Sequence, residues 1–401
     1  MTKKSDAPAI RFKGFSDAWE QRKLGDVVKE ITRNDPESEA PIMMITANNG
    51  FIEQSERYAF NNAGESLKKY ILLKKGELAY NHGASKLRPY GSCFALTTAE
   101  NARIPFVYHC FSAENQNAEF MSIELNGAEI ENQLRKIVSS GARMDGLLNI
   151  SFDEYTSVSV LLPGTEEQDR IADFFRQLDH LITLHQRKFE KLTNVKKSML
   201  EKMFPQNGSC YPAVRFKGFT GPWERRKFGD VFEEYSEKNR ADLPPLTIIQ
   251  GSGTIRRDES ERALQYDKAS LSNYKVVNEG DLIVHLRSFE GGLEKANSQG
   301  IISPAYHTFH GEGVDSRFYY TYFRSKNFID TDLKPHVYGI RDGRSIDIEG
   351  MKTIEIPFTS YPEQKLIGDA VDSINTLISL QRRELEKLQS IKKSLLEKMF
   401  V

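Results

Sequence analysis

The feature that most constrains this chain is a long internal repeat. Residues 10–27 (IRFKGFSDAWEQRKLGDV) and 214–231 (VRFKGFTGPWERRKFGDV) are identical at 12 of 18 positions. A later pair, residues 188–204 (KFEKLTNVKKSMLEKMF) and 384–400 (ELEKLQSIKKSLLEKMF), agrees at 11 of 17. The interiors between these ends differ. A unit of roughly 200 residues is too long for a solenoid repeat, so the sequence predicts a duplicated domain, each copy followed by a helix.

Each copy ends in a long helical pattern that opens with Glu-Gln (Glu167-Gln168 and Glu363-Gln364). Apolar residues then recur at alternating spacings of four and three over more than four heptads, which indicates a coiled coil. The expected seam residues are Ile171, Phe175, Leu178, Ile182, Phe189, Leu192 and Met199 in the first copy, and Ile367, Val371, Ile374, Ile378, Leu385, Leu388 and Leu395 in the second.

Polar residues interrupt this seam at the same two places in both copies, as His185 and Gln381 and then as Lys196 and Lys392. Such residues cost stability and can fix the register of paired helices. Because neither helix can bury its apolar stripe alone, we expect the two helices to pack on each other in antiparallel orientation.

The expected fold is mixed α/β (α+β). Two similar domains with a twisted sheet are related by pseudo-twofold symmetry and separated by a long antiparallel two-helix coiled coil. The expected segments are a disordered N-terminus (1–9), a first domain (10–164), a central helix (165–204), a linker (205–213), a second domain (214–361) and a C-terminal helix (362–401). Candidate strands are 78–80, 106–111 and 156–162 in the first domain, and 282–286, 306–309 and 352–357 in the second.

Composition excludes some classes of protein. A net charge of −1, from 55 basic and 56 acidic residues, argues against a protein that coats nucleic acid through bulk positive charge, but allows a basic face. No apolar stretch approaches ~18 residues and no signal-peptide core is present, so we expect no membrane span and a cytoplasmic location. Three cysteines without a C-x-x-C pair, Cys93, Cys110 and Cys210, favour reduced thiols.

At this point the chain resembles the DNA-specificity (S) subunits of Type I restriction-modification systems. The opening W-E-x-R-K-[LF]-G-D-V (19–27 and 223–231) is similar to the start of their target-recognition domains, as are the K-K-G-E-L and N-E-G-D-L segments that follow. The exit of each copy has a G-x-R segment (141–143 and 339–341), then a strand, a proline and the Glu-Gln of the helix. The resemblance covers essentially the whole chain, twice and in the same order.

The resemblance implies that each domain reads one half of a bipartite, asymmetric site in double-stranded DNA. It also implies that the helices hold the gap between the halves and bind two modification subunits. Those subunits bind S-adenosylmethionine and methylate adenine, while restriction subunits supply ATP- and Mg-dependent translocation and cleavage. No cofactor and no metal are expected on this chain itself.

Candidate DNA-binding residues lie on Gly-containing segments that offer donors and positive charge, as base and phosphate contacts require. A loop at 81–90 follows a predicted strand, its equivalent in the second copy is 285–292, and a Gly-rich loop is expected at 251–257. The candidates are His82, Ser85, Lys86, Arg88, Arg143, Arg256, Arg257, His285, Arg287, Arg341 and Arg344. Taken singly, each candidate is as compatible with an ordinary solvent-exposed position as with a DNA contact. Trp19 and Trp223 are expected in the core.

Two other classes of function stay open on the sequence, a divergent methyltransferase or nuclease and a protein-only coiled-coil scaffold. No G-x-x-x-x-G-K-[ST] is present, and the chain's Pro-Pro pair, Pro244-Pro245, follows Leu243 rather than the Asn or Asp of adenine methyltransferases. His307 and His310 fall on a predicted strand, where this spacing directs side chains to opposite faces, so no metal site is expected there.

Overall fold

The structure is a computed structural model that describes residues 8–47, 50–58, 64–138, 147–206, 208–260, 268–339 and 345–400. The chain forms two compact units, which we call unit 1 (Met1–His185 with Glu384–Val401) and unit 2 (Gln186–Arg383). Residues 1–7 of the segment expected to be disordered lie outside the described residues. Each unit therefore contains a globular body and part of both long helices, a different grouping from the expected segments.

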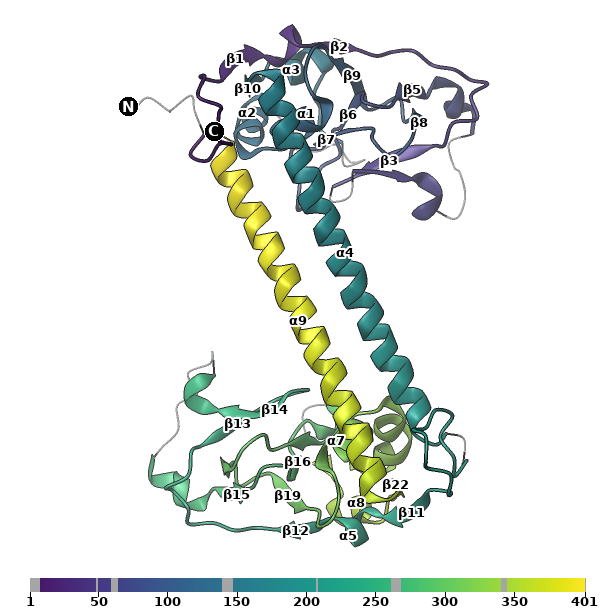
Figure 1. The fold of residues 1–401 in the computed structure, drawn as a ribbon, viewed down its shortest axis with the longest axis vertical. Helices are drawn as coiled ribbons and strands as arrows, with labels where there is room; N and C mark the ends of the chain where they lie inside the picture. Colours follow the sequence, from purple (N-terminus) through teal and green to yellow (C-terminus); the bar gives the residue numbers. More distant parts are fainter. Residues whose placement is uncertain are drawn as a thin grey trace. The chain divides into compact units, whose positions relative to one another are not determined.

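Unit 1 is built around a four-stranded antiparallel sheet in the order β2-β9-β6-β7 (Figure 1). These strands are Val28–Glu30, His109–Ala113, Leu78–Asn81 and Ser92–Ala95. Three antiparallel pairs surround the sheet: β1 (Glu20–Lys23) with β10 (Ser159–Leu162), β3 (Met43–Thr46) with β4 (Gly50–Glu53), and β5 (Ile71–Lys74) with β8 (Asn101–Ile104). The helices of the body are α1 (Ala118–Leu125), α2 (Ala128–Ile137) and α3 (Phe152–Thr156).

Unit 2 repeats this plan, with a four-stranded sheet in the order β12-β19-β16-β17. These strands are Glu233–Tyr235, His307–His310, Leu282–Val284 and Glu294–Lys295. The surrounding pairs are β11 (Glu224–Lys227) with β22 (Glu355–Phe358), β13 (Leu246–Ile249) with β14 (Gly253–Arg256), β15 (Lys275–Val277) with β18 (Gly300–Ile302), and β20 (Val337–Tyr338) with β21 (Ser345–Ile346). The helices are α5 (Phe228–Val231), α6 (Ser288–Gly291), α7 (Ser316–Phe323) and α8 (Ile348–Lys352), with a π-helix at Phe328–Leu333.

The equivalent central strands β6 and β16 are buried on both faces, because successive side chains alternate across a strand. In β6, Leu78 and Tyr80 pack into the main core of unit 1, whereas Ala79 enters a second core between the smaller strand pairs. In β16, Leu282 and Val284 face the main core of unit 2 and Ile283 faces a second one. Each body therefore has a core on both sides of its sheet, which fits the mixed fold predicted from the sequence.

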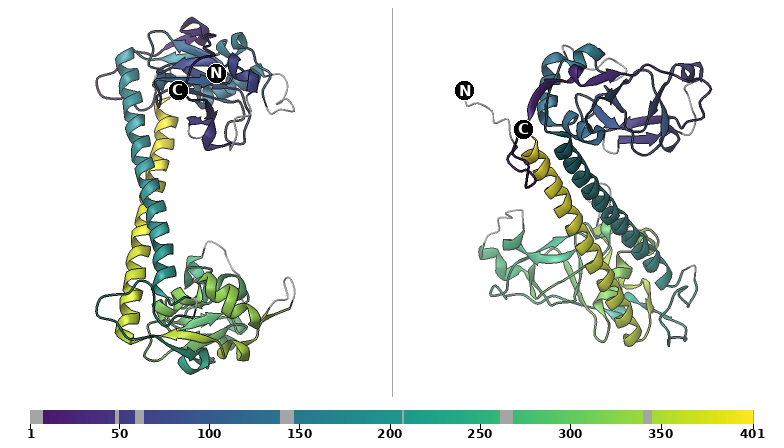
Figure 2. Two further views of the ribbon diagram at one scale, coloured as in Figure 1. Left: turned by 90° about the vertical axis from the view of Figure 1, so that its right-hand side faces the viewer. Right: turned by 45° about the horizontal axis from the view of Figure 1, so that its top comes forward.

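The two longest helices are α4 (Thr165–Met203) and α9 (Tyr361–Met399), so each begins in one unit and ends in the other. Within unit 1, Ile171, Phe175 and Leu178 at the start of α4 share a core with Met399 near the end of α9. Within unit 2, Ile367 and Val371 at the start of α9 share a core with Met203 at the end of α4. The helix segments in each unit thus pack in antiparallel orientation, side by side in both figures (Figures 1 and 2).

Burial along these helices follows the heptad pattern of the sequence. Every predicted seam residue is buried or half-buried, including the polar interruptions His185, Lys196, Gln381 and Lys392, whereas the apolar residues Leu181, Leu184, Leu377 and Leu380 outside the seam are exposed. Trp19 and Trp223 are 3% exposed, as expected for core residues.

The buried Glu-Gln pair attaches the start of each helix to its body. In unit 1, Arg11 donates to both carboxylate oxygens of Glu167, at 2.9 and 2.6 Å. The amide oxygen of Gln168 accepts from the backbone N–H of Asn117 at 3.0 Å. In unit 2, Gln364 accepts in the same way from the N–H of Asp315 at 3.0 Å. The side chains that the repeat preserves therefore position the helix at equivalent places in both copies.

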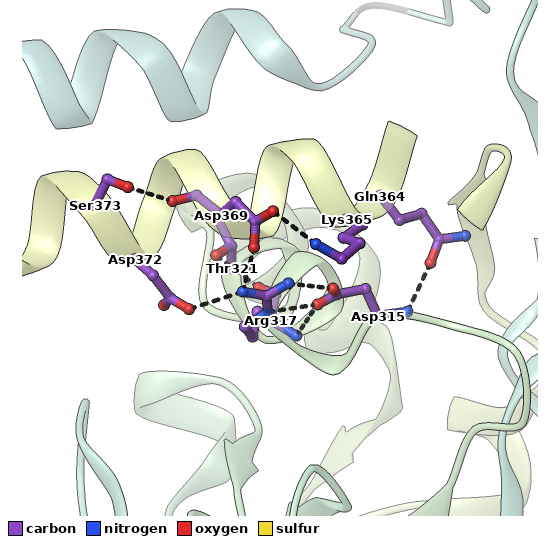
Figure 3. Close-up of polar contacts among 8 residues, drawn as sticks. All are labelled: Asp315, Arg317, Thr321, Gln364, Lys365, Asp369, Asp372 and Ser373. Carbon is purple, nitrogen blue, oxygen red and sulfur yellow. Dashed lines mark hydrogen bonds and ion pairs between the residues drawn. The ribbon is translucent and has the colours of Figure 1, made fainter. Parts of the chain in front are cut away.

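Helix α7 is also fastened to α9 through Arg317, which lies among three carboxylates (Figure 3). Its guanidinium contacts Asp315 at 2.6 Å, Asp369 at 2.7 Å and Asp372 at 3.2 Å. The hydrogen bond to Asp315 is the largest of the effects that raise the pKa of Arg317 above its ordinary value. This cluster fixes one face of α9 against the body of unit 2.

Several predicted strands are shorter than expected, because turns and short helices occupy their first residues. Residues 105–108 form a turn closed by a hydrogen bond from the N–H of Tyr108 to the oxygen of Pro105 (3.0 Å), so β9 begins at His109. Thr156 ends α3, whose N-cap Ser151 forms a capping box with Glu154, and β10 begins at Ser159. Lys352 likewise ends α8, ahead of β22.

Candidate nucleic-acid interface

In unit 1, the predicted loop 81–90 does connect β6 to β7, and its two ends are firmly anchored. Asn81 donates from its side-chain amide to the oxygen of Ile45 at 3.1 Å and accepts from the N–H of Gly83 at 2.9 Å. The hydroxyl of Tyr80 donates to the oxygen of Tyr90 at 2.6 Å. Gly91 has φ +81°, and a Cβ there would lie 2.6 Å from the oxygen of Asn81, so this return into β7 requires glycine.

Two of the four candidates in this loop hold it in place. Both ring nitrogens of His82 lie 2.7 Å from carbonyl oxygens, those of Leu148 and Val107. Arg88 donates to the oxygen of Asn126 at 2.7 Å, and burial lowers the pKa of its guanidinium. Both side chains therefore anchor the loop to the rest of the body.

The other two candidates, Ser85 and Lys86, are exposed at the tip of the loop, next to the 58% exposed Leu87. The Ser85 hydroxyl accepts from the N–H of Arg88 at 3.0 Å and closes the tip. Within the described ranges, Lys86 has no ion-pair partner. Of the four, Lys86 is the residue whose charge is available to a phosphate group.

In unit 2, the expected Gly-rich loop 251–257 is wrong, because residues 253–256 form strand β14 and pair with β13. The irregular part is confined to the turn Gln250–Ser252, after which Thr254 and Ile255 continue as an ordinary strand. Arg256 and Arg257 lie at the opposite end of β14 from this turn. Arg256 forms an exposed ion pair with Asp258 at 2.8 Å, and Arg257 lies over the ring of Tyr274 at 5.2 Å.

His285 and Arg287 follow β16, where a short helix α6 replaces the expected loop. The Nδ1 atom of His285 accepts from the N–H of Arg287 at 3.3 Å, so the neutral ring carries its proton on Nε2. Burial, with the positive charges of Arg324 and Arg287, lowers the pKa of His285 to about 4. His285 is therefore neutral near pH 7, whereas the exposed Arg287 offers a charge to solvent.

The turn Gln250–Ser252 is held by a residue that the sequence analysis missed. Glu294 of β17 is fully buried and accepts from the N–H groups of Gly251 (2.7 Å) and Gly253 (3.0 Å). It also accepts from the hydroxyl of Tyr320 at 2.9 Å and forms an ion pair with Arg324. No motif marks Glu294, because its partners lie 26 to 43 residues away in sequence.

The remaining candidates, Arg143, Arg341 and Arg344, lie outside the described residues.

His307 and His310 project from β19 toward different carboxylates, Glu234 and Asp281, each at 2.7 Å. Among the described residues, no group of three or more His, Cys, Asp or Glu side chains is arranged to hold a metal ion. Nor does any helix in those ranges carry an apolar stretch long enough to cross a bilayer.

Each body holds an antiparallel sheet, and two long helices pass from one unit into the other, which is a fold found in a solved specificity subunit. In three dimensions the chain is similar to the Type I restriction-modification system S subunit from M. genitalium, with a TM-score of 0.56 and 12% identity, over 98% of this chain and 99% of that one. This likeness concerns the fold.

Sequence comparison finds two relatives from Methanocaldococcus jannaschii. The putative Type I restriction enzyme MjaX specificity subunit is 23% identical over 269 residues, 62% of this chain and 60% of the relative. The Type I restriction enzyme MjaVIII specificity subunit is 25% identical over 279 residues, 65% of each. The matched part thus spans less than two thirds of either relative. No family model matches the chain. The resemblance to specificity subunits predicted from the sequence is confirmed.

Proposed function

We propose that this chain is the DNA-specificity subunit of a Type I restriction-modification complex. In this proposal each unit reads one half of a bipartite, asymmetric site in double-stranded DNA. The observation that carries it is the contrast within the repeat: the helices and their Arg-Glu-Gln attachments recur, whereas the segments that hold the exposed loops differ between copies. A protein that presents two different surfaces on one framework is suited to reading two different half-sites.

The paired helices are proposed to set the gap between the half-sites and to dock two modification subunits. Support comes from their continuity, since α4 and α9 each pass from one unit into the other. Methyl transfer and cleavage are assigned to the modification and restriction subunits, which would hold S-adenosylmethionine, ATP and Mg. This chain is proposed to be non-catalytic and to act in the cytoplasm.

The proposal is tested by expressing the chain with its modification subunits and mapping methylated adenines by single-molecule sequencing. We expect one bipartite motif with a gap of fixed length. Exchanging residues 28–158 for those of another specificity subunit should change one half of the motif and preserve the other. The purified chain alone should transfer no methyl group to DNA. Methylation by the chain alone would favour a divergent methyltransferase. A methylated motif that stays the same after the exchange of residues 28–158 would favour a protein-only scaffold.

A further inference from the structure

Unit 2 contains a cavity of about 1240 Å³ beside the seam of its helix pair. Its walls come from the last part of α4, from α7, from α9 and from the turn Gln250–Ser252 that Glu294 holds. Seven Lys or Arg residues and five Asp or Glu residues line it, so positive charge is in excess. The lysines are Lys196, Lys197, Lys295 and Lys326.

The arginines among these residues are already engaged with carboxylates. Arg317 contacts Asp372 at 3.2 Å, Arg225 lies 3.8 Å from Glu355, and Arg324 forms an ion pair with the buried Glu294. By contrast, the four lysines of the cavity have no ion-pair partner among the residues that the structure describes. Lys196 is half-buried, and its pKa is lowered by burial and by the nearby charge of Arg324. A cation held there against burial and repulsion gains most from an anionic ligand.

The equivalent lysine of unit 1 has a different environment. Lys392 of α9 forms an ion pair with Asp179 of α4 at 2.5 Å. The helix repeat has an offset of 196 residues, which relates Lys392 to Lys196 and Asp179 to Asn375. Asn375 also lines the cavity. The substitution of an amide for a carboxylate at this one position therefore leaves Lys196 without the partner that its counterpart has.

We propose that the cavity of unit 2 binds a phosphate group of the DNA backbone through Lys196, with Lys197, Lys295 and Lys326 around it. This inference rests on the proposed function and adds to it a contact that is independent of base sequence. It also makes the two copies unequal, because in unit 1 Asp179 already neutralises Lys392. Lys196 of α4 would thus hold the DNA backbone next to the half-site that unit 2 is proposed to read.

The test measures binding of the full chain to a mixed-sequence DNA duplex over a range of salt concentrations. One phosphate contact contributes about 0.9 to the slope of log K against log salt, which corresponds to about eightfold in affinity at 0.1 M salt. We expect Lys196→Met and Asn375→Asp each to bind DNA about eightfold more weakly at 0.1 M salt, with a salt slope that is smaller by about 0.9. Asn375→Asp keeps the lysine and restores the carboxylate of unit 1, so it separates loss of the site from a folding defect. Lys392→Met, the matched control, should bind DNA like the wild type.

Unchanged affinity and slope in both unit 2 variants, in a chain that still binds DNA, would overturn this inference and leave the proposed function standing. A wild-type chain that binds no duplex at low salt would overturn both. Calorimetry with inorganic phosphate separates the two sources of the anion. Phosphate binding that Lys196→Met abolishes while duplex binding is unaffected would assign the cavity to a free anion and reject the backbone contact.

Discussion

Arg215 donates to both oxygens of Glu363, at 2.6 and 2.9 Å, across 148 residues of sequence. The Glu363 side chain is 1% exposed and also accepts from the indole N–H of Trp223 at 3.1 Å. Together these bonds connect the opening segment of the second copy to the first turn of α9. Arg11 and Glu167 form the same pair in the first copy.

Removing one partner of such a pair leaves a buried charge uncompensated, at a cost of about 3–5 kcal/mol. We expect Arg215→Ala to lower the unfolding free energy of unit 2 by about that amount. The chain has two tryptophans, one in each body, so fluorescence-detected urea unfolding in a Trp19→Phe background reports on unit 2 through Trp223. The exposed pair of Arg240 and Asp242 supplies the control, since Arg240→Ala should leave the free energy of unfolding nearly unchanged. Equal effects of the two substitutions would contradict the buried role of Glu363.

His285 makes the stability of unit 2 depend on pH. Burial lowers its pKa from 6.5 to about 4, so between these values the unfolded chain binds more protons than the folded one. Stability therefore rises with pH through this window and falls as acid is added from pH 6.5 toward pH 4. In urea unfolding across this window, the free energy of unfolding should change less steeply with pH in His285→Gln than in the wild type. Parallel profiles would show that His285 is not the group responsible.

Lys86 and Arg88, two residues apart in one loop, should respond in opposite ways. We expect Lys86→Ala to keep stability within about 0.5 kcal/mol while lowering the salt slope of DNA binding by about 0.9. Arg88→Ala removes the donor to the oxygen of Asn126, so it should destabilise unit 1 by about 1–3 kcal/mol. Thermal unfolding and salt titration of both variants separate the two roles. A destabilised Lys86 variant with normal DNA binding would refute the assignment of Lys86.

The spacer role of the helices is tested by an insertion of four residues between Leu192 and Lys196. Four residues lengthen a helix by about 6 Å and shift the heptad register, so the seam can no longer face its partner along its whole length. We expect an altered gap in the methylated motif or loss of assembly, read by single-molecule sequencing and by size-exclusion chromatography. A matched pair of seven-residue insertions, one in each helix, preserves the register and should lengthen the tolerated gap. An unchanged gap in a well-assembled insertion variant would disprove the spacer role.

The sequence predicts the helices well because a heptad pattern over ten positions averages out local exceptions, and both helices begin within one residue of the expected start. The predicted loop around Arg256 is wrong, because glycines next to a short strand look like part of a loop in the sequence until the pairing of that strand with β13 is known. Glu294 and Asn375 carry no local signal at all. Their meaning depends on which residues face them across the fold, and neither composition nor periodicity contains that information.

The Arg-Glu-Gln attachments have a consequence for how such a chain can change. Because both bodies meet their helices through the same few side chains, an interior segment can be replaced without altering either junction. Under the proposed function, new combinations of half-sites would then arise by exchange of whole bodies, while the helices proposed to dock partner subunits stay constant.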